Sequence, residues 1–206
     1  MQNPAVVTPG SIAFDLDAVK VHLRVVGASE DAALTLIALA ATDALQDYLG
    51  CAFTTTTYLW TRDAFAPGRS PTDDFWYEDR PSGPRAPVYL KLPFGPVQSV
   101  THIKYLDDAG VLQTWSPSNY QLDTFYGRVA PVPGAVWPTP ARDRFSAVQI
   151  QFVAGFGATF SSIPARVTLG LYMLIGHWFE NREELQTFSL QHVPLGLFNL
   201  IDEFKR

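Results

Sequence analysis

Cysteine is nearly absent from this sequence of 206 residues, and its scarcity removes two classes of protein. The one cysteine, Cys51, cannot form an internal disulfide and cannot supply the ligand set of a cysteine-rich zinc site. Charged residues are also sparse, at 17% against a usual share of about 25%. Hydrophobic residues make up 47%, which excludes the disordered class. We therefore expect one folded domain, or one domain with a large insertion.

Long apolar runs and targeting signals are missing as well. The longest nearly apolar stretch, residues 167–179, contains Gly176 and His177 and falls short of the roughly 20 residues that span a bilayer. Residues 1–10 have neither a basic start nor an apolar run before a cleavage site, so we expect no secretory signal. Together with the single cysteine, these absences favour folding inside a cell and no membrane partner.

Positive charge is in deficit. Fifteen Lys and Arg residues stand against twenty Asp and Glu residues, and the net charge is -5. A protein that binds nucleic acid by neutralising many phosphates needs more Lys and Arg residues than Asp and Glu residues. Any contact with DNA should therefore be loose.

Proline separates a central region from two helical ends. Twelve of the 16 prolines lie between Arg62 and Phe145. Apolar spacing predicts a helix over 15–26 that Gly27 stops, and a second helix that Ser29 caps and Gly50 ends. The two form an antiparallel pair. A third helix starts at Ile163-Pro164, runs to about residue 184, is apolar nearly all round and should be central.

The central region predicts β-structure. Threonine and aromatic residues over 53–60 suit a strand, and residues 67–87 read as a long exposed loop. Further short strands, which we expect to form one small sheet with a turn at 107–110, are predicted over 88–92, 97–106, 120–123, 127–129 and 147–154.

The predicted fold class is α+β. Three main helices and a C-terminal tail form a small helical bundle, with a β-rich insertion between the second and third helices. The expected regions are an N-terminal helical pair over 1–52, the insertion over 53–160, and the central helix with the tail over 161–206. The helical regions form one structural unit.

The sequence offers little chemistry. His177 and Glu180 lie three residues apart, but no HExxH arrangement accompanies them, so a structural role is expected for His177. Gly155-Phe156-Gly157 reads as a tight turn, because neither a third glycine nor a P-loop lysine follows it. There is no GxSxG elbow. We predict no catalytic, cofactor or metal site and no enzyme.

Two apolar segments lack an expected place in the core. The tail over 195–206 carries hydrophobic residues for which the predicted helices leave no obvious room. Within the polar loop, Phe75-Trp76-Tyr77 lies between acidic residues that keep it near water. These aromatic residues either anchor a contact with a tail protein or another subunit, or pack back on their own sheet. Both readings stay open.

Several segments in order resemble the phage head-tail connector (adaptor) family, which also occurs in gene transfer agents. His22-Leu23-Arg24 and Tyr48-Leu49-Gly50 are similar to its first two helices. Ile103 to Asp107 and Tyr120 to Asp123 are similar to an inserted β-region. His177 to Glu183 resembles the final helix, and Val193 to Gly196 a motif near the end. The loop over 73–85 departs from the shorter members.

The resemblance implies a structural virion protein. Copies, commonly twelve, would form a ring beneath the portal, extend its DNA channel and offer a platform for a tail-side neck protein, a stopper or tail terminator. Packaged double-stranded DNA would pass through without specific binding, which the negative charge suits. The protein would act at the virion neck after assembly in the bacterial host cytoplasm. The tail would pack against the portal through Leu195, Leu197, Phe198, Leu200, Ile201, Phe204 and Arg206.

Two alternatives come from other classes. One is a tail-associated enzyme that degrades polysaccharide with the acidic pairs Asp73-Asp74 and Glu78-Asp79, which requires two carboxyl groups at a defined separation. The other is a soluble binding module. A stable monomer with an acidic cleft would favour the enzyme, and a ring would favour the connector.

Overall fold

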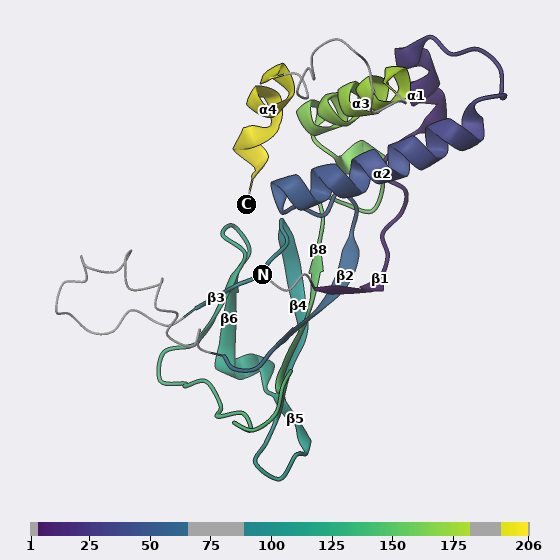
Figure 1. Cartoon of the computed structure of the whole chain (residues 1–206). Helices are drawn as coiled ribbons and strands as arrows, with labels where there is room; N and C mark the ends of the chain where they lie inside the picture. Colours follow the sequence, from purple (N-terminus) through teal and green to yellow (C-terminus); the bar gives the residue numbers. More distant parts are fainter. Residues whose placement is uncertain (1–3, 66–88, 182–194, 206) are drawn as a thin grey trace. The chain divides into compact units, whose positions relative to one another are not determined.

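The computed structural model describes residues 4–65, 89–181 and 195–205 (Figure 1). The chain divides into two compact units. The helical unit comprises Pro9–Thr56, Phe94–Pro96 and Ala154–Arg206, and the sheet unit comprises Met1–Thr8, Thr57–Pro93 and Val97–Val153. Helices and antiparallel strand pairs in one chain confirm the predicted α+β class.

The first helix of the helical unit is shorter than predicted. Helix α1 spans Leu16–Leu23, and the Asp15 carboxylate caps it by accepting a 3.0 Å hydrogen bond from the Asp17 amide. It ends at Arg24, which lies in the left-handed region with φ 56°, so Gly27 is not its stop. The apolar spacing in the sequence therefore extends to Val26, three residues beyond the last residue of the helix.

The second helix, α2, spans Asp31–Leu49 and ends at Gly50 as predicted. Gly50 adopts φ 62°, a conformation that glycine takes without a steric penalty. The start differs, because Glu30 is the cap residue, without a side-chain capping bond, and Ser29 is not. A 2.7 Å ion pair from Lys20 to Asp31 joins α1 to the first turn of α2.

The C-terminal part adds two helices and two short 3-10 turns. Helix α3 spans Ala165–Glu180 and begins after Pro164, and helix α4 spans Leu195–Ile201. Turn η3 spans Phe160–Ser162 and turn η4 spans Asp202–Phe204. Helix α3 contacts α1, α2 and α4 (Figure 1). Its central place was predicted, and its buried residues include Val167, Leu171, Leu174 and Ile175.

One hydrophobic core holds the helical unit together. The α2 residues Leu34, Ala38, Ala41, Leu45 and Leu49 are buried along one face, at the three- and four-residue spacing of an amphipathic helix. Val19 of α1 and Phe53, which follows α2, are fully buried in the same unit. Burying a side chain of this size contributes about 1.5–3 kcal/mol. Phe53 therefore belongs to the core of the helical unit. The strand that was predicted to begin at residue 53 begins at Thr56.

The sheet unit contains two sheets, so the prediction of one small sheet is wrong. The five-stranded sheet has the order β1-β2-β8-β4-β5, and the three-stranded sheet has the order β3-β7-β6. Their strands are β1 Ala5–Thr8, β2 Thr56–Arg62, β3 Leu90–Lys91, β4 Val97–Leu106, β5 Leu112–Trp115, β6 Tyr120–Asp123, β7 Arg128–Pro131 and β8 Val148–Ala154.

Strands β1 and β5 were not predicted, whereas the turn between β4 and β5 was. Asp107 closes that turn by accepting a 2.9 Å hydrogen bond from the Val111 amide, and Gly110 supplies φ 77°. A 3-10 turn, η2, spans Pro117–Asn119 and precedes β6. In β8, buried and half-buried residues alternate, as the period of a strand requires.

Candidate assembly surfaces

The C-terminal segment packs against the helical unit. Ile201 is fully buried in its core, and Leu200 and Phe204 are half-buried against the same cluster. The Phe156 and Phe204 rings meet edge to face with centroids 6.3 Å apart. The expectation that the tail finds no room in the core is therefore wrong for Ile201. Ile201 is the last residue of α4, directly before η4, and its side chain belongs to the same core cluster as residues of α1, α2 and α3.

Polar contacts hold the same segment. The Tyr48 hydroxyl on α2 donates a 2.8 Å hydrogen bond to Oδ1 of Asp202, and this bond raises the pKa of Tyr48. Lys205 Nζ lies 4.3 Å from the centre of the Tyr48 ring. The Cys51 thiol donates to the main-chain oxygen of Phe204 at 3.2 Å. Turn η4 is thus joined to Tyr48 in the last turn of α2 and to Cys51, which follows the helix.

An ion pair adds a link to α3. Arg166 Nη1 donates to Oε1 of Glu203, and the contact raises the pKa of the arginine. Both side chains are more than half exposed, so the pair contributes modestly. Residues 200–205 therefore form a docked element of the helical unit.

The structure describes some of the predicted interface residues. The side chains of Leu195, Leu197 and Phe198 lie outside what is described, although their backbone forms α4. Arg206 and the loop residues Phe75, Trp76 and Tyr77 lie outside the described residues altogether. The contacts predicted for these residues stay predictions.

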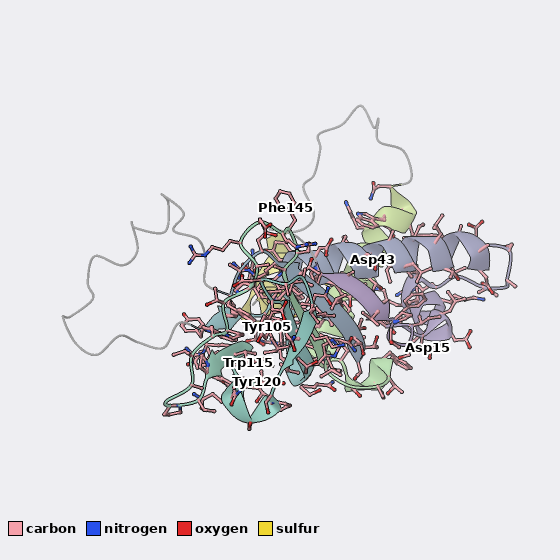
Figure 2. All side chains as sticks on the ribbon, turned by 90° about the horizontal axis from the view of Figure 1, so that it is seen from below. Asp15, Asp43, Tyr105, Trp115, Tyr120 and Phe145 are labelled. Atoms are coloured by element: carbon pink, nitrogen blue, oxygen red, sulfur yellow. The ribbon has the colours of Figure 1, made fainter. Side chains whose placement is uncertain are left out.

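An aromatic cluster fills part of the sheet unit. Phe65 and Trp137 stack with ring centres 4.8 Å apart, and Trp115 lies 4.8 Å from Trp137. Trp115 also stacks on Tyr120 at 5.5 Å (Figure 2). Phe65 and Trp115 are buried, and burial raises the pKa of Tyr120. Since β5 and β6 carry Trp115 and Tyr120, this cluster connects the two sheets.

The turn between β6 and β7 exposes two aromatic side chains. Phe125 and Tyr126 are exposed, and their amides donate to Oδ1 of Asp123 at 3.1 and 3.2 Å. The Arg128 guanidinium pairs with Oδ2 of the same carboxylate at 2.7 Å and lies over the rings of Tyr126 and Tyr89. Asp123 therefore organises both the turn and the arginine. Farther along the unit, Phe145 is also exposed (Figure 2).

A pocket of about 280 Å³ lies beside this ion pair, lined by Tyr89, Gln121, Leu122, Asp123, Arg128 and Ala130. The hydrogen bond from Arg128 is the main reason that the pKa of Asp123 is lowered. The carboxyl group is held ionised, which suits an acceptor and not a general acid. Among the described residues that line the pocket there is one carboxylate, whereas glycoside hydrolysis uses a pair.

Two further residues considered from the sequence lie in the part of the chain that is described. His177, at the last turn of α3, accepts through its main-chain oxygen from the Asn181 side chain at 2.8 Å. Gly155 has φ 138° and accommodates a close approach of the Thr54 backbone. Among residues 4–65, 89–181 and 195–205, no group of three metal-binding side chains lies together, and no helix is long and apolar enough to cross a membrane.

Comparison with known proteins gives one kind of match. No family model and no curated protein matches the sequence. A chain from the neck of an empty gene transfer agent (GTA) particle, computed with C6 symmetry, is 23% identical with a TM-score of 0.74, over 99% of this chain and 95% of that one. A chain from the virion of a native GTA particle is 24% identical with a TM-score of 0.73, over 99% and 95%.

A third similar chain comes from the neck of a native GTA particle computed with C12 symmetry. It is 24% identical with a TM-score of 0.70, over 100% of this chain and 94% of that one. The whole chain, helical unit and sheet unit together, therefore has the fold of chains from GTA particles. The resemblance that the sequence suggested is confirmed at the level of the fold.

Proposed function

We propose that this protein is a structural subunit of a virion neck, a head-tail connector that sits beneath the portal and carries the next tail component. The observation that carries the proposal is the match over 99% of this chain and 95% of a GTA neck chain. Because both chains are covered almost completely, the likeness is not limited to a common subdomain. A fold can host unrelated functions, so the residues must support the role as well.

The ring form is supported by the symmetry of the similar structures. Two of these necks were computed with C6 and C12 symmetry, and cyclic assemblies use one repeated contact between identical chains. We propose a ring of twelve copies around the DNA channel. The net charge of -5 would keep DNA phosphates from adhering to the channel as the DNA slides.

The C-terminal segment is the proposed contact with the portal. Ile201, Leu200 and Phe204 fix it to the helical unit, which would let neighbouring residues of the segment engage the portal from a defined position. In this proposal Ile201 is an anchor, and Leu195, Leu197, Phe198 and Arg206 make the contact. Phe75, Trp76 and Tyr77 would serve the tail-side neck protein, either a stopper or a tail terminator, or an adjacent subunit.

Imaging of particles made with and without this subunit tests the role. Without it, we expect full heads that lack tails or leak DNA after assembly in the host cytoplasm. Complementation with the intact gene should restore tailed particles. Purified virions that contain none of this polypeptide at the neck would contradict the proposal.

Substitution in the C-terminal segment tests the portal contact. Deleting 195–206 would also remove Ile201 from the core, so the sharper variant is Leu197→Asp with Phe198→Asp. We expect it to fold and to lose binding to portal-bearing heads. Asp108→Lys, an exposed change in the sheet unit, is the control. Unchanged binding by the double variant would refute the contact.

A further inference from the structure

Helix α2 has a second stripe that faces away from its buried one. The α2 patch, as we call it, consists of Ala32, Leu36, Leu39, Ala40, Asp43, Ala44 and Asp47, all exposed at helical spacing. Leu36 is 69% exposed. Alanine predominates around the leucines, so another element can approach the helix backbone closely. Its last two turns carry the carboxylates of Asp43 (Figure 2) and Asp47.

A second apolar patch lies at the end of α1. The α1 patch consists of Val21, His22, Arg24 and Val26, and all four are exposed. Val21 in the last turn of α1 is 79% exposed, and Val26, two residues beyond the Arg24 cap, is 93% exposed. Arg24 projects from a left-handed backbone position, a conformation unfavourable for a residue with a Cβ. This position separates Arg24 from the regular face of α1.

The charges at the two patches are opposite and unsatisfied. Neither Arg24 nor Asp43 nor Asp47 forms an ion pair within the described part of the chain, whereas nearby Lys20 is held by Asp31. Each patch combines exposed aliphatic side chains with charge at one end. Opposite charges on two surfaces that bind each other steer their association and fix its register.

The two patches cannot cover each other within one chain, because each faces away from the core that α1 and α2 share. They can do so between copies. When one surface binds a different surface of the next copy, repetition of the contact gives a ring if the rotation between copies closes and a filament if it does not. We propose that the α2 patch of one subunit packs against the α1 patch of its neighbour, with Asp43 and Asp47 facing Arg24. This inference rests on the proposed ring and names its repeated contact.

Charge reversal tests the contact directly. Arg24→Glu alone, or Asp43→Lys with Asp47→Lys, places like charges in every interface of the ring. We expect each variant to lower ring formation by about tenfold or more. The triple variant with all three changes restores opposite charges and should form rings to within about threefold of the unchanged protein. Asp108→Lys is the matched control, since it reverses an exposed aspartate in the sheet unit.

Rings are counted by native mass spectrometry and by imaging of portal-bearing heads after addition of each purified protein. Circular dichroism checks that each variant folds. If either reversed variant forms rings like the unchanged protein, or if the triple variant fails to recover while it folds, the contact is wrong. If the unchanged protein forms no ring either alone or on the heads, the proposed function itself fails.

Two variants that change no charge test the apolar part of the contact between subunits. Leu36→Gln and Val21→Gln remove one aliphatic side chain from each patch, and Val136→Gln removes an equally exposed valine elsewhere. The first two should weaken ring formation at high salt, where the charge contribution is screened, and the third should not. Equal behaviour of all three would overturn the apolar contact.

Discussion

Tyr48 and Asp202 are 154 positions apart in the sequence, and the tyrosine hydroxyl donates a 2.8 Å hydrogen bond to the aspartate. The bond joins the last turns of α2 to η4, and Ile201 is buried directly before it. The C-terminal segment is therefore a defined part of the helical unit. If this segment also binds the portal, the portal would contact an element that is packed into the core of the subunit.

Titration of Tyr48 should reveal this bond. Its pKa is raised in the folded protein, so the folded state favours the protonated phenol. The resulting stabilisation is complete below about pH 10 and is lost as the pH rises through the raised pKa. Ultraviolet titration of Asp202→Ala should show one tyrosine returning toward its ordinary pKa, while Asp108→Ala should not. An unchanged titration curve in Asp202→Ala would contradict the bond.

Ile201→Ala should destabilise the helical unit. The side chain is fully buried, and removing a buried isoleucine costs about 2–5 kcal/mol through lost transfer energy and the cavity left behind. Urea unfolding measures the loss. Val136→Ala, which shortens an exposed side chain outside the proposed subunit contact, should change the free energy of unfolding by about 0.5 kcal/mol or less. Equal stabilities for the two variants would mean that Ile201 is not in the core.

Asp123 should act in two separable ways at the β6-β7 turn. In Asp123→Asn the side-chain oxygen can still accept from the Phe125 and Tyr126 amides, but the ion pair with Arg128 is lost. In Asp123→Ala both are lost. Amide hydrogen exchange at positions 125 and 126 should therefore be faster in the alanine variant than in the asparagine variant. Identical exchange in both variants would contradict the turn contact.

The lowered pKa of Asp123 also fixes the direction of a pH effect. A depressed carboxyl pKa contributes stability that is present above the unfolded value of about 3.9 and is lost as the pH falls through the folded value. The protection of the amides at this turn, which is how much more slowly they exchange than an unstructured peptide at the same pH, should therefore fall in acid. This fall in protection should be absent in Asp123→Ala.

Gly155→Ala should be more harmful than Gly27→Ala. Both glycines have positive φ, but a Cβ at Gly155 would lie 2.5 Å from the main-chain oxygen of Thr54, while a Cβ at Gly27 would meet nothing within 4 Å. The alanine at 27 therefore reports conformational strain alone, and the difference between the variants reports the clash together with the greater backbone strain at φ 138° than at φ 88°. Thermal melting measures both. A smaller loss at 155 would show that the backbones separate easily.

Patterns with a clear local cause were predictable from the sequence. The stripe on α2 and its stop at Gly50 follow from side-chain spacing and from the conformational freedom of glycine. Strand β4 was predicted at its observed limits, since it is long and rich in strand-forming residues. By contrast, β1 and β5 were not predicted although β6, which is equally short, was. All four residues of β1 and three of the four residues of β5 are exposed, so these strands have little of the buried face from which a strand is recognised in a sequence.

The site residues depend on packing that no local pattern encodes. Ile201 looked unpartnered because its neighbours in the core, Cys51 among them, come from distant parts of the chain. The link between Arg128 and Tyr126 could be suspected from their closeness in sequence, but the approach of Tyr89 could not. The alanine and leucine residues of the exposed stripe of α2 can be identified in the sequence. Because the buried stripe also contains alanine and leucine, the sequence alone does not show which of the two stripes faces the core.

The thiol of Cys51 lies under the main chain of Phe204, and it is the sole cysteine of the molecule. Its buried position makes it a natural chemical reporter. A maleimide or a fluorescent alkylating dye can label it only when the core around it opens, for example when η4 separates from α2, so the labelling rate measures how often such opening happens. Slower labelling upon mixing with heads would register portal engagement without any engineered tag.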